Sequence, residues 1–164
     1  MSFWLWPTTA DVGMRLFASS LSHLLVEGAL GTQHYLMSSR ASRTMNEHLR
    51  HAGEWRVRSP HDAHDPSFLF IAWLEEVLYR AEVHNQWLVD VQCRVEHSND
   101  GLEILAHVEW VDADKVEREI EIKAVTTHQL VVTEVEQGVR VPSRWPEVPT
   151  FEGPGWYADV VFDI

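Results

Sequence analysis

The chain has 164 residues, 45% of them hydrophobic and 23% charged, which predicts one folded domain over residues 1–164 and excludes general disorder. Its 25 acidic and 13 basic residues give a net charge of −12, which disfavours direct binding of nucleic acid and favours a metal ion or a basic protein partner. Cys93 is the only cysteine, so an intrachain disulfide is excluded. No apolar run approaches the roughly 20 residues of a membrane-spanning helix, and the N-terminus lacks a signal peptide's basic flank, so we expect a cytoplasmic protein.

The first half of the chain predicts two strands followed by two main helices. Trp4 and Trp6 suggest a short first strand, and a second strand is predicted to start near Asp11, where apolar residues begin to alternate. Helical spacing of leucines predicts a helix over 20–36, which begins at a serine N-cap. The strongest helix is predicted over 66–84 with an aspartate N-cap before it, and its wide apolar face predicts packing on more than one side.

Between residues 38 and 65 the helical pattern is interrupted by a local basic region and a short strand predicted at 55–58. One interpretation is a surface that faces a partner or RNA. The other, which we prefer, is a solvated loop followed by a strand with one polar face. The region contains five arginines, Arg40, Arg43, Arg50, Arg56 and Arg58.

The second half of the chain switches to a period of two and predicts consecutive strands. Strands are expected over 87–97 and 102–111, joined by an Asp-Gly hairpin turn, and again over 119–125 and 130–136. Residues 138–154 hold four prolines and predict an irregular surface loop. This order of elements predicts an α+β fold, with an antiparallel or mixed sheet and helices on one side.

The last ten residues predict a strand with one fully apolar face, formed by Trp156, Ala158, Val160, Phe162 and Ile164. We therefore expect the chain end to belong to the fold and to hold its carboxylate beside the acidic side chain at position 163. Two carboxylates at such a short separation repel each other unless a cation or a positively charged side chain lies between them.

Aspartates near both ends of the chain are candidate ligands for a metal ion. If the first and last strands lie side by side, Asp11 and Asp163 converge with the carboxylate of Ile164, and such oxygen ligands suit Ca²⁺, Mg²⁺ or Mn²⁺ rather than zinc. Phosphate-binding loops, nucleophile elbows and zinc-protease motifs are absent from the sequence. Lys123 and His128 are the other candidate site residues.

Three separated stretches resemble the archease family. Residues 9–15, which begin Thr-Ala-Asp-Val-Gly, are similar to the family's Thr-Ala-Asp-(Ile/Val)-Gly opening. Residues 73–79 resemble its Trp-Leu-x-Glu-Leu-Leu-Tyr helix. Residues 121–128 and the closing residues 160–164 resemble Glu-Val-Lys-Ala-Val-Thr-Tyr-His and Val-Val-Phe-Asp-(Val/Ile).

The resemblance implies an archease-like α+β fold, with two main helices packed on mostly antiparallel or mixed sheets. It implies a protein cofactor, not an enzyme, that activates the tRNA-splicing ligase, which joins 3′-phosphate or cyclic-phosphate RNA ends to 5′-hydroxyl ends, by promoting its guanylylation and turnover. Nucleic acid is then contacted only through the ligase. The activating residues correspond to Asp11, Lys123 and Asp163. A divalent metal, typically Ca²⁺ with Mg²⁺ or Mn²⁺ as alternatives, is implied between the two aspartates and the carboxylate of Ile164.

The sequence departs from the family pattern at several positions. Thr8 stands where the family has histidine, Thr127 stands where it has an aromatic residue, and residues 138–154 form a longer insertion than is usual. Two other functions therefore stay open. One is a metal-dependent phosphoesterase with His128 as the base, and the other is a metal-free interaction protein. Self-association into a homo-oligomer is also left open.

Overall fold

A computed structural model of the chain describes residues 2–164, with the side chain of Asp62 left out. Three α-helices are present: α1 (Leu21–Leu36), α2 (Ser39–Thr44) and α3 (Pro66–Val83). The strands are β1 (Phe3–Pro7), β2 (Asp11–Ala18), β3 (His51–Arg58), β4 (Gln86–Ser98), β5 (Gly101–Asp112), β6 (Ala124–Val135), β7 (Arg140–Val141), β8 (Phe151–Glu152) and β9 (Gly155–Asp163). Among the described helices, none is long and apolar enough to cross a membrane.

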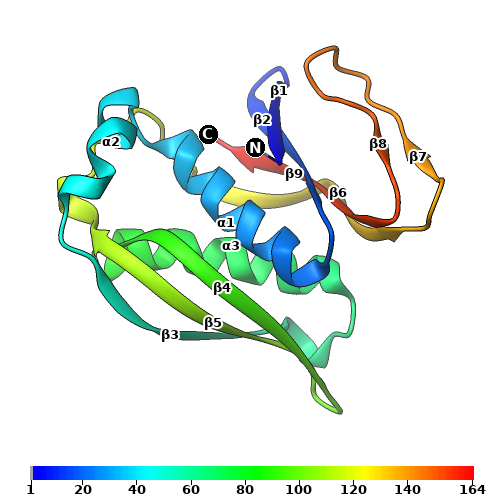
Figure 1. The fold of residues 1–164 in the computed structure, drawn as a ribbon, viewed down its shortest axis with the longest axis horizontal. Helices are drawn as coiled ribbons and strands as arrows, with labels where there is room; N and C mark the ends of the chain where they lie inside the picture. Colours follow the sequence, from blue (N-terminus) through cyan, green and yellow to red (C-terminus); the bar gives the residue numbers. More distant parts are fainter. Residues whose placement is uncertain (1) are drawn as a thin grey trace.

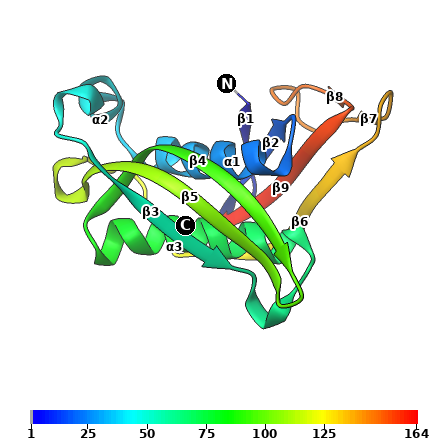
Figure 2. The same ribbon diagram turned by 60° about the horizontal axis from the view of Figure 1, so that its bottom comes forward.

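The strands form two main antiparallel sheets with the long helices between them. One sheet has four strands in the order β1-β2-β9-β6, and the other has three in the order β3-β5-β4. Helices α1 and α3 lie side by side, and each contacts strands of both sheets (Figures 1 and 2). Each of these sheets therefore has the helices on one side, as expected, and both helices bury apolar residues in two directions, as the wide apolar face of α3 indicates.

The main core is built from the inner faces of both sheets and the two long helices. Strand alternation places Met14 and Leu16 of β2, and Val160 and Phe162 of β9, against the helices, where all four are fully buried. Trp73 of α3 lies at the centre of this core, and its indole N–H donates to the carbonyl of Leu25 in α1 at 2.8 Å. This core holds β2 and β9 as a rigid pair.

The ends of both long helices agree with the capping residues in the sequence. The hydroxyl of Ser20 accepts a hydrogen bond from the amide of His23, and the carboxylate of Asp65 accepts one from the amide of Ser67. Helix α3 also begins with Pro66 in its first turn, where a missing N–H costs nothing. These predictions are confirmed within one or two residues.

Two elements differ from the sequence-based prediction. Residues 119–123 were expected to belong to a strand over 119–125, but the strand β6 begins only at Ala124 and then runs without interruption to Val135. The expected break after 125 is instead a bulge, since the register moves from Thr126 opposite Val161 to Val131 opposite Asp159. The short helix α2 was not predicted, because six residues are too few to show helical periodicity.

The proline-rich residues 138–154, here called the strap, contain a small hairpin of β7 and β8 and lie against the outer face of the four-stranded sheet (Figure 1). Trp145 stacks on Trp6 of β1 with ring centroids 4.3 Å apart. Phe151 stacks on Phe17 of β2 at 4.6 Å. The strap is therefore packed onto the sheet by aromatic contacts and is more ordered than the irregular surface loop that the prolines predict.

Candidate functional site

The two candidate aspartates are brought together by the pairing of β2 with β9. Asp11 is the first residue of β2, and it lies directly opposite Asp163, the last residue of β9, in the antiparallel register. Residues opposite each other in such a pair project to the same face of the sheet, with Cβ atoms about 5 Å apart. The two carboxylates therefore share the outer face at one end of the sheet.

Strand β6 brings Lys123 to the same end. Ala124 pairs with Asp163 from the other side of β9, and the amide of Lys123 donates to the carbonyl of Asp163 at 2.8 Å. The ammonium of Lys123 donates to the main-chain oxygen of Ile164 at 3.1 Å. One positive side chain therefore contacts the chain end directly, next to the two opposed aspartates.

Thr8, which departs from the family pattern, has a local role in the turn before Asp11. Its hydroxyl accepts a hydrogen bond from the amide of Asp11 at 3.0 Å, and its own amide donates to the carbonyl of Asp11 at 3.3 Å. These two bonds close the turn between β1 and β2. Thr8 thus fixes the backbone of Asp11 rather than offering a metal ligand of the imidazole type.

The expectation for Ile164 needs correction. The strand β9 ends at Asp163, and the side chain of Ile164 is 38% exposed rather than part of the apolar face. A strand needs a partner on its edge to continue, and here the main chain of Ile164 is held instead by the Lys123 ammonium. The chain end is therefore fixed by a polar contact and not by burial of its side chain.

The carboxylates of Asp11 and Asp163 suffice for a hard cation only if the carboxylate of Ile164 also serves as a ligand. Asp11 is half-buried and Asp163 is exposed, so both keep access to solvent. Opposed carboxylates repel each other across a strand pair, and this repulsion is relieved when a cation binds between them. Within residues 2–164, no cluster of three or more His, Cys, Asp or Glu side chains is arranged to hold a metal. Carboxylate oxygens from Ile164 would be the third source of ligands, and an all-oxygen set suits Ca²⁺ or Mg²⁺.

His128 does not join this group. It is exposed and lies in the bulge of β6, where its amide donates to the Thr126 hydroxyl at 3.3 Å. It lies four positions after Ala124, the partner of Asp163, in a stretch of β6 that has left the register with β9. Over the described residues, its side chain makes no hydrogen bond or ion pair with either aspartate or with Lys123. This arrangement gives no support to His128 as the base of a hydrolase.

A buried ion pair on the same outer face was missed by sequence reasoning. Arg15 of β2 lies opposite Asp159 of β9, and the guanidinium also donates to the carbonyl of Pro142 in the strap at 2.9 Å. The signal that could have revealed it is a charged residue in the middle of each of two otherwise apolar strands. A cleft of about 570 Å³ lies between this pair, the β6 bulge and the strap, with Arg15, Gln129, Leu130, Trp145, Tyr157 and Asp159 in its lining.

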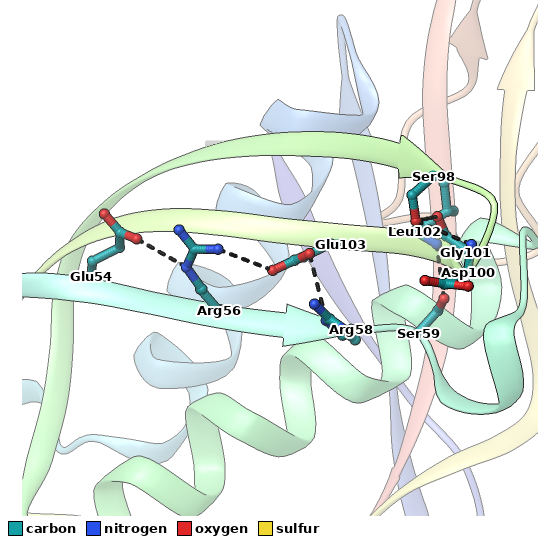
Figure 3. Close-up of polar contacts among 9 residues, drawn as sticks. All are labelled: Glu54, Arg56, Arg58, Ser59, Ser98, Asp100, Gly101, Leu102 and Glu103. Carbon is teal, nitrogen blue, oxygen red and sulfur yellow. Dashed lines mark hydrogen bonds and ion pairs between the residues drawn. The ribbon is translucent and has the colours of Figure 1, made fainter.

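The basic region of the sequence is largely neutralised by acidic neighbours. Arg56 lies between Glu54 and Glu103 on the outer face of the three-stranded sheet, with its Nε 3.2 Å from Glu54, and Arg58 also faces Glu103 at 3.6 Å (Figure 3). Arg50 pairs with a further glutamate at 2.8 Å. These exposed pairs favour the interpretation of a solvated polar face over that of an RNA-binding patch.

Comparisons with known proteins agree on one family. A family model described as "Archease protein family (MTH1598/TM1083)" matches residues 3–164. The curated "Protein archease" of Thermococcus gammatolerans is 27% identical over 139 residues, which cover 84% of this chain and 88% of that protein. The solution structure of Methanobacterium thermoautotrophicum protein 1598 matches with a TM-score of 0.64 and 18% identity, and covers 99% of both chains. At that identity the structural likeness bears on the fold alone, and it confirms the predicted α+β architecture.

Proposed function

Because the chain belongs to the archease family, we propose that it is a non-catalytic protein cofactor that activates an RNA-splicing ligase by promoting its guanylylation. The observation that carries the proposal is the meeting of Asp11, Asp163 and Lys123 at one end of the four-stranded sheet. These three residues come from segments that are far apart in the sequence. An acidic pair with an adjacent ammonium is suited to handling a divalent cation and phosphate groups together.

The two aspartates would bind a divalent cation, probed first with Ca²⁺, together with the carboxylate of Ile164. When bound, such a cation neutralises charge on a phosphate group and orients it. The pairing of β2 with β9 holds the two carboxylates at a fixed separation, so little side-chain ordering is required on binding. The open position of Asp163 at the strand end leaves room for a partner to approach.

Lys123 would supply a point positive charge beside the bound nucleotide. Its ammonium has three donors, and one of them already contacts the main-chain oxygen of Ile164 at 3.1 Å. The remaining donors are free to reach a phosphate oxygen, where a positive charge stabilises the charge that develops during phosphoryl or nucleotidyl transfer. The same side chain thus links the chain end to the substrate of the ligase.

The experiment mixes the protein with its cognate RNA-splicing ligase and radiolabelled GTP, and follows the label that becomes attached to the ligase. Asp163→Asn keeps the size of the side chain but removes its charge, and we expect it to abolish most of the stimulation. Asp114→Asn changes an exposed aspartate of the 3₁₀ turn after β5 and serves as the matched control. Equal labelling with wild type and Asp163→Asn would contradict the proposal.

Calorimetry gives a readout that does not depend on the ligase. Titration with Ca²⁺, Mg²⁺ and Mn²⁺ should show binding to the wild-type protein and its loss in Asp11→Asn. Heat of binding that is unchanged in this variant would place the cation elsewhere. Stimulation of the ligase without any cation binding would leave Lys123 as the active group and remove the metal from the proposal.

A further inference from the structure

A segment with the pattern of a strand lacks a strand partner in this fold. From Arg118 to Lys123 the side chains alternate, with Ile120 and Ile122 half-buried and Glu119, Glu121 and Lys123 exposed. This is the alternation of an extended segment with one face on the core. Yet, among the described residues, the only β-bridge of the segment is an isolated antiparallel one between Arg118 and Met37, and β6 begins after Lys123.

The main chain of the segment is hydrogen-bonded at both ends and unpaired in the middle. At one end the amide of Glu119 donates to the carbonyl of Leu36 at 3.0 Å, and at the other the amide of Lys123 donates to Asp163 at 2.8 Å. In the part of the chain that the structure describes, the main chain of residues 120–122 neither donates nor accepts a hydrogen bond. Unpaired main-chain groups of this kind are a template for an added strand.

A groove of about 430 Å³ lies beside this segment. Its apolar lining comes from Leu36 at the end of α1, Leu78 of α3, Ile120 and Ile122. Its charged lining comes from three glutamates, Glu82, Glu119 and Glu121, and from one arginine, Arg118. The groove therefore offers apolar contact and negative charge at the same place.

Two of the three glutamates in the groove have no cationic partner. Glu82 pairs with Arg118, whose guanidinium also lies over the ring of Trp87, 5.2 Å from its centroid. For Glu119 and Glu121, no ion pair is formed with any residue from 2 to 164. A ligand that carries positive charge would complete this arrangement, whereas a nucleic-acid backbone would be repelled by it and by the net charge of −12.

The groove ends one residue before the candidate site along the chain. Ile122 lines it, and the next residue, Lys123, contacts the chain end at Ile164. A partner that binds in the groove would therefore arrive beside Asp163. This adjacency of Ile122 and Lys123 relates the binding of a partner to the position of the proposed activating residues.

We propose that an extended segment of the RNA ligase, with lysine or arginine on either side of an apolar residue, binds in this groove; this rests on the proposed function. Its main chain pairs with residues 120–122, its apolar side chain packs on Leu78 and Ile122, and its cations contact Glu119 and Glu121. Strand addition of this type derives affinity from main-chain hydrogen bonds and specificity from alternate side chains. Proteins that bind nucleic acid carry basic surfaces, which complement the acidic lining.

The first test reverses the charge of the groove. The double variant Glu119→Lys/Glu121→Lys should weaken binding to the ligase about tenfold or more, because like charges across an interface are strongly unfavourable. Glu134→Lys/Glu136→Lys makes the same change in charge at the same spacing at the far end of β6, where both residues are exposed, and should bind like wild type. Binding is measured by calorimetry with purified ligase, and guanylylation is measured at saturating cofactor, where the groove variant should recover.

The second test uses the wild-type protein and hydrogen exchange. On addition of ligase, the amides of residues 120–122 should become protected, while those of the solvent-facing sheet β3-β5-β4 should not change. Two results would show that the ligase segment does not bind in the groove while leaving the proposed function intact. One is unchanged hydrogen exchange at residues 120–122 on addition of ligase. The other is equal affinity of the groove and control variants for a ligase that both still activate. Absence of any binding or activation by the wild-type protein would overturn both. If RNA alone displaces the ligase from the protein, the groove binds nucleic acid and the proposal of a ligase segment is contradicted.

Discussion

Arg15 and Asp159 lie opposite each other on β2 and β9 and are joined by two hydrogen bonds, Nε to Oδ1 and Nη2 to Oδ2, each 2.7 Å long. Arg15 is only 7% exposed, and the hydrogen bond to Asp159 raises its pKa further above the ordinary value despite the opposing effect of burial. Its third bond, to the carbonyl of Pro142, holds the strap against the sheet. One ion pair thus connects β2 and β9 to the strap.

Removing one member of this pair should be far more costly than replacing both. We expect Asp159→Ala to lower the free energy of unfolding by about 3–5 kcal/mol, because the buried guanidinium is left without its counter-ion. The double variant Arg15→Met/Asp159→Leu should recover most of that loss, since it leaves no buried charge. Urea unfolding followed by circular dichroism measures both. A double variant as unstable as the single one would show that the pair itself, and not the orphaned charge, determines stability.

Gly13 lies beneath the indole of Trp6, and a Cβ added there would overlap the ring. We expect Gly13→Ala to lower stability by about 1–3 kcal/mol and to disturb the stack of Trp6 on Trp145, because overpacking forces the ring to move. Thermal unfolding and tryptophan fluorescence report the two effects. In a Trp6→Ala background, Gly13→Ala should lower stability only slightly. An equal loss of stability in that background would show that the effect of Gly13→Ala does not arise from contact with the indole of Trp6.

The contact of Lys123 with the main-chain oxygen of Ile164 predicts sensitivity to any residue added after Ile164. A Gly-Ser-Gly extension moves the terminal charge away from Asp11 and Asp163, and should weaken Ca²⁺ binding about tenfold or more, because affinity follows the number of charged ligands. The same three residues added before Met1 provide the control. Calorimetry measures the affinity, and circular dichroism verifies that folding is unchanged. Equal affinities in the two extended proteins would remove the chain end from the ligand set.

Burial raises the pKa of the Cys93 thiol to about 12, so the thiol should be inert at neutral pH. Reaction with a thiol reagent at pH 8 should be much slower in the folded protein than in urea. The sign of the pH effect follows from linkage: above the ordinary value of 9.0 the folded state holds its proton longer than the unfolded state, so stability falls as pH rises towards 12. The decline is at most about 1.4 kcal/mol for each pH unit. Cys93→Ala should remove this part of the decline, and an identical pH profile in the variant would assign it to other groups.

Local signals in the sequence were sufficient for the two long helices and for the end strands. Ser20 and Asp65 mark helix starts by their chemistry, and the apolar residues at every second position from Trp156 to Phe162 identify the last strand. The convergence of Asp11 with Asp163 was predicted on the condition that the first and last strands lie side by side. In the structure the neighbour of β9 is the second strand, β2, and this pairing places the two aspartates opposite each other. Membership of the family is also confirmed, over residues 3–164.

Features that depend on distant partners could not be read from the sequence. The alternation over 119–123 is real, but a strand also needs a neighbour with free hydrogen-bonding groups, and no pattern within the segment says whether one exists. The Arg15–Asp159 pair joins positions 144 residues apart, so it requires the strand order as well as the residues. The packing of the strap against Trp6 and Phe17 is hidden for the same reason.

The pairing of β2 with β9 has a consequence for how the protein is made. Strand β2 leaves the ribosome before the helices, but its neighbour on one side, β9, is synthesised only after the other described strands. Until β9 has been synthesised, one edge of β2 has no strand partner and the growing chain lacks one of the two opposed aspartates. Pairings between distant segments form slowly because a long loop must close first. A truncated product that stops before β9 would therefore lack the pairing of Asp11 with Asp163, and under the proposed function we expect it not to stimulate the ligase.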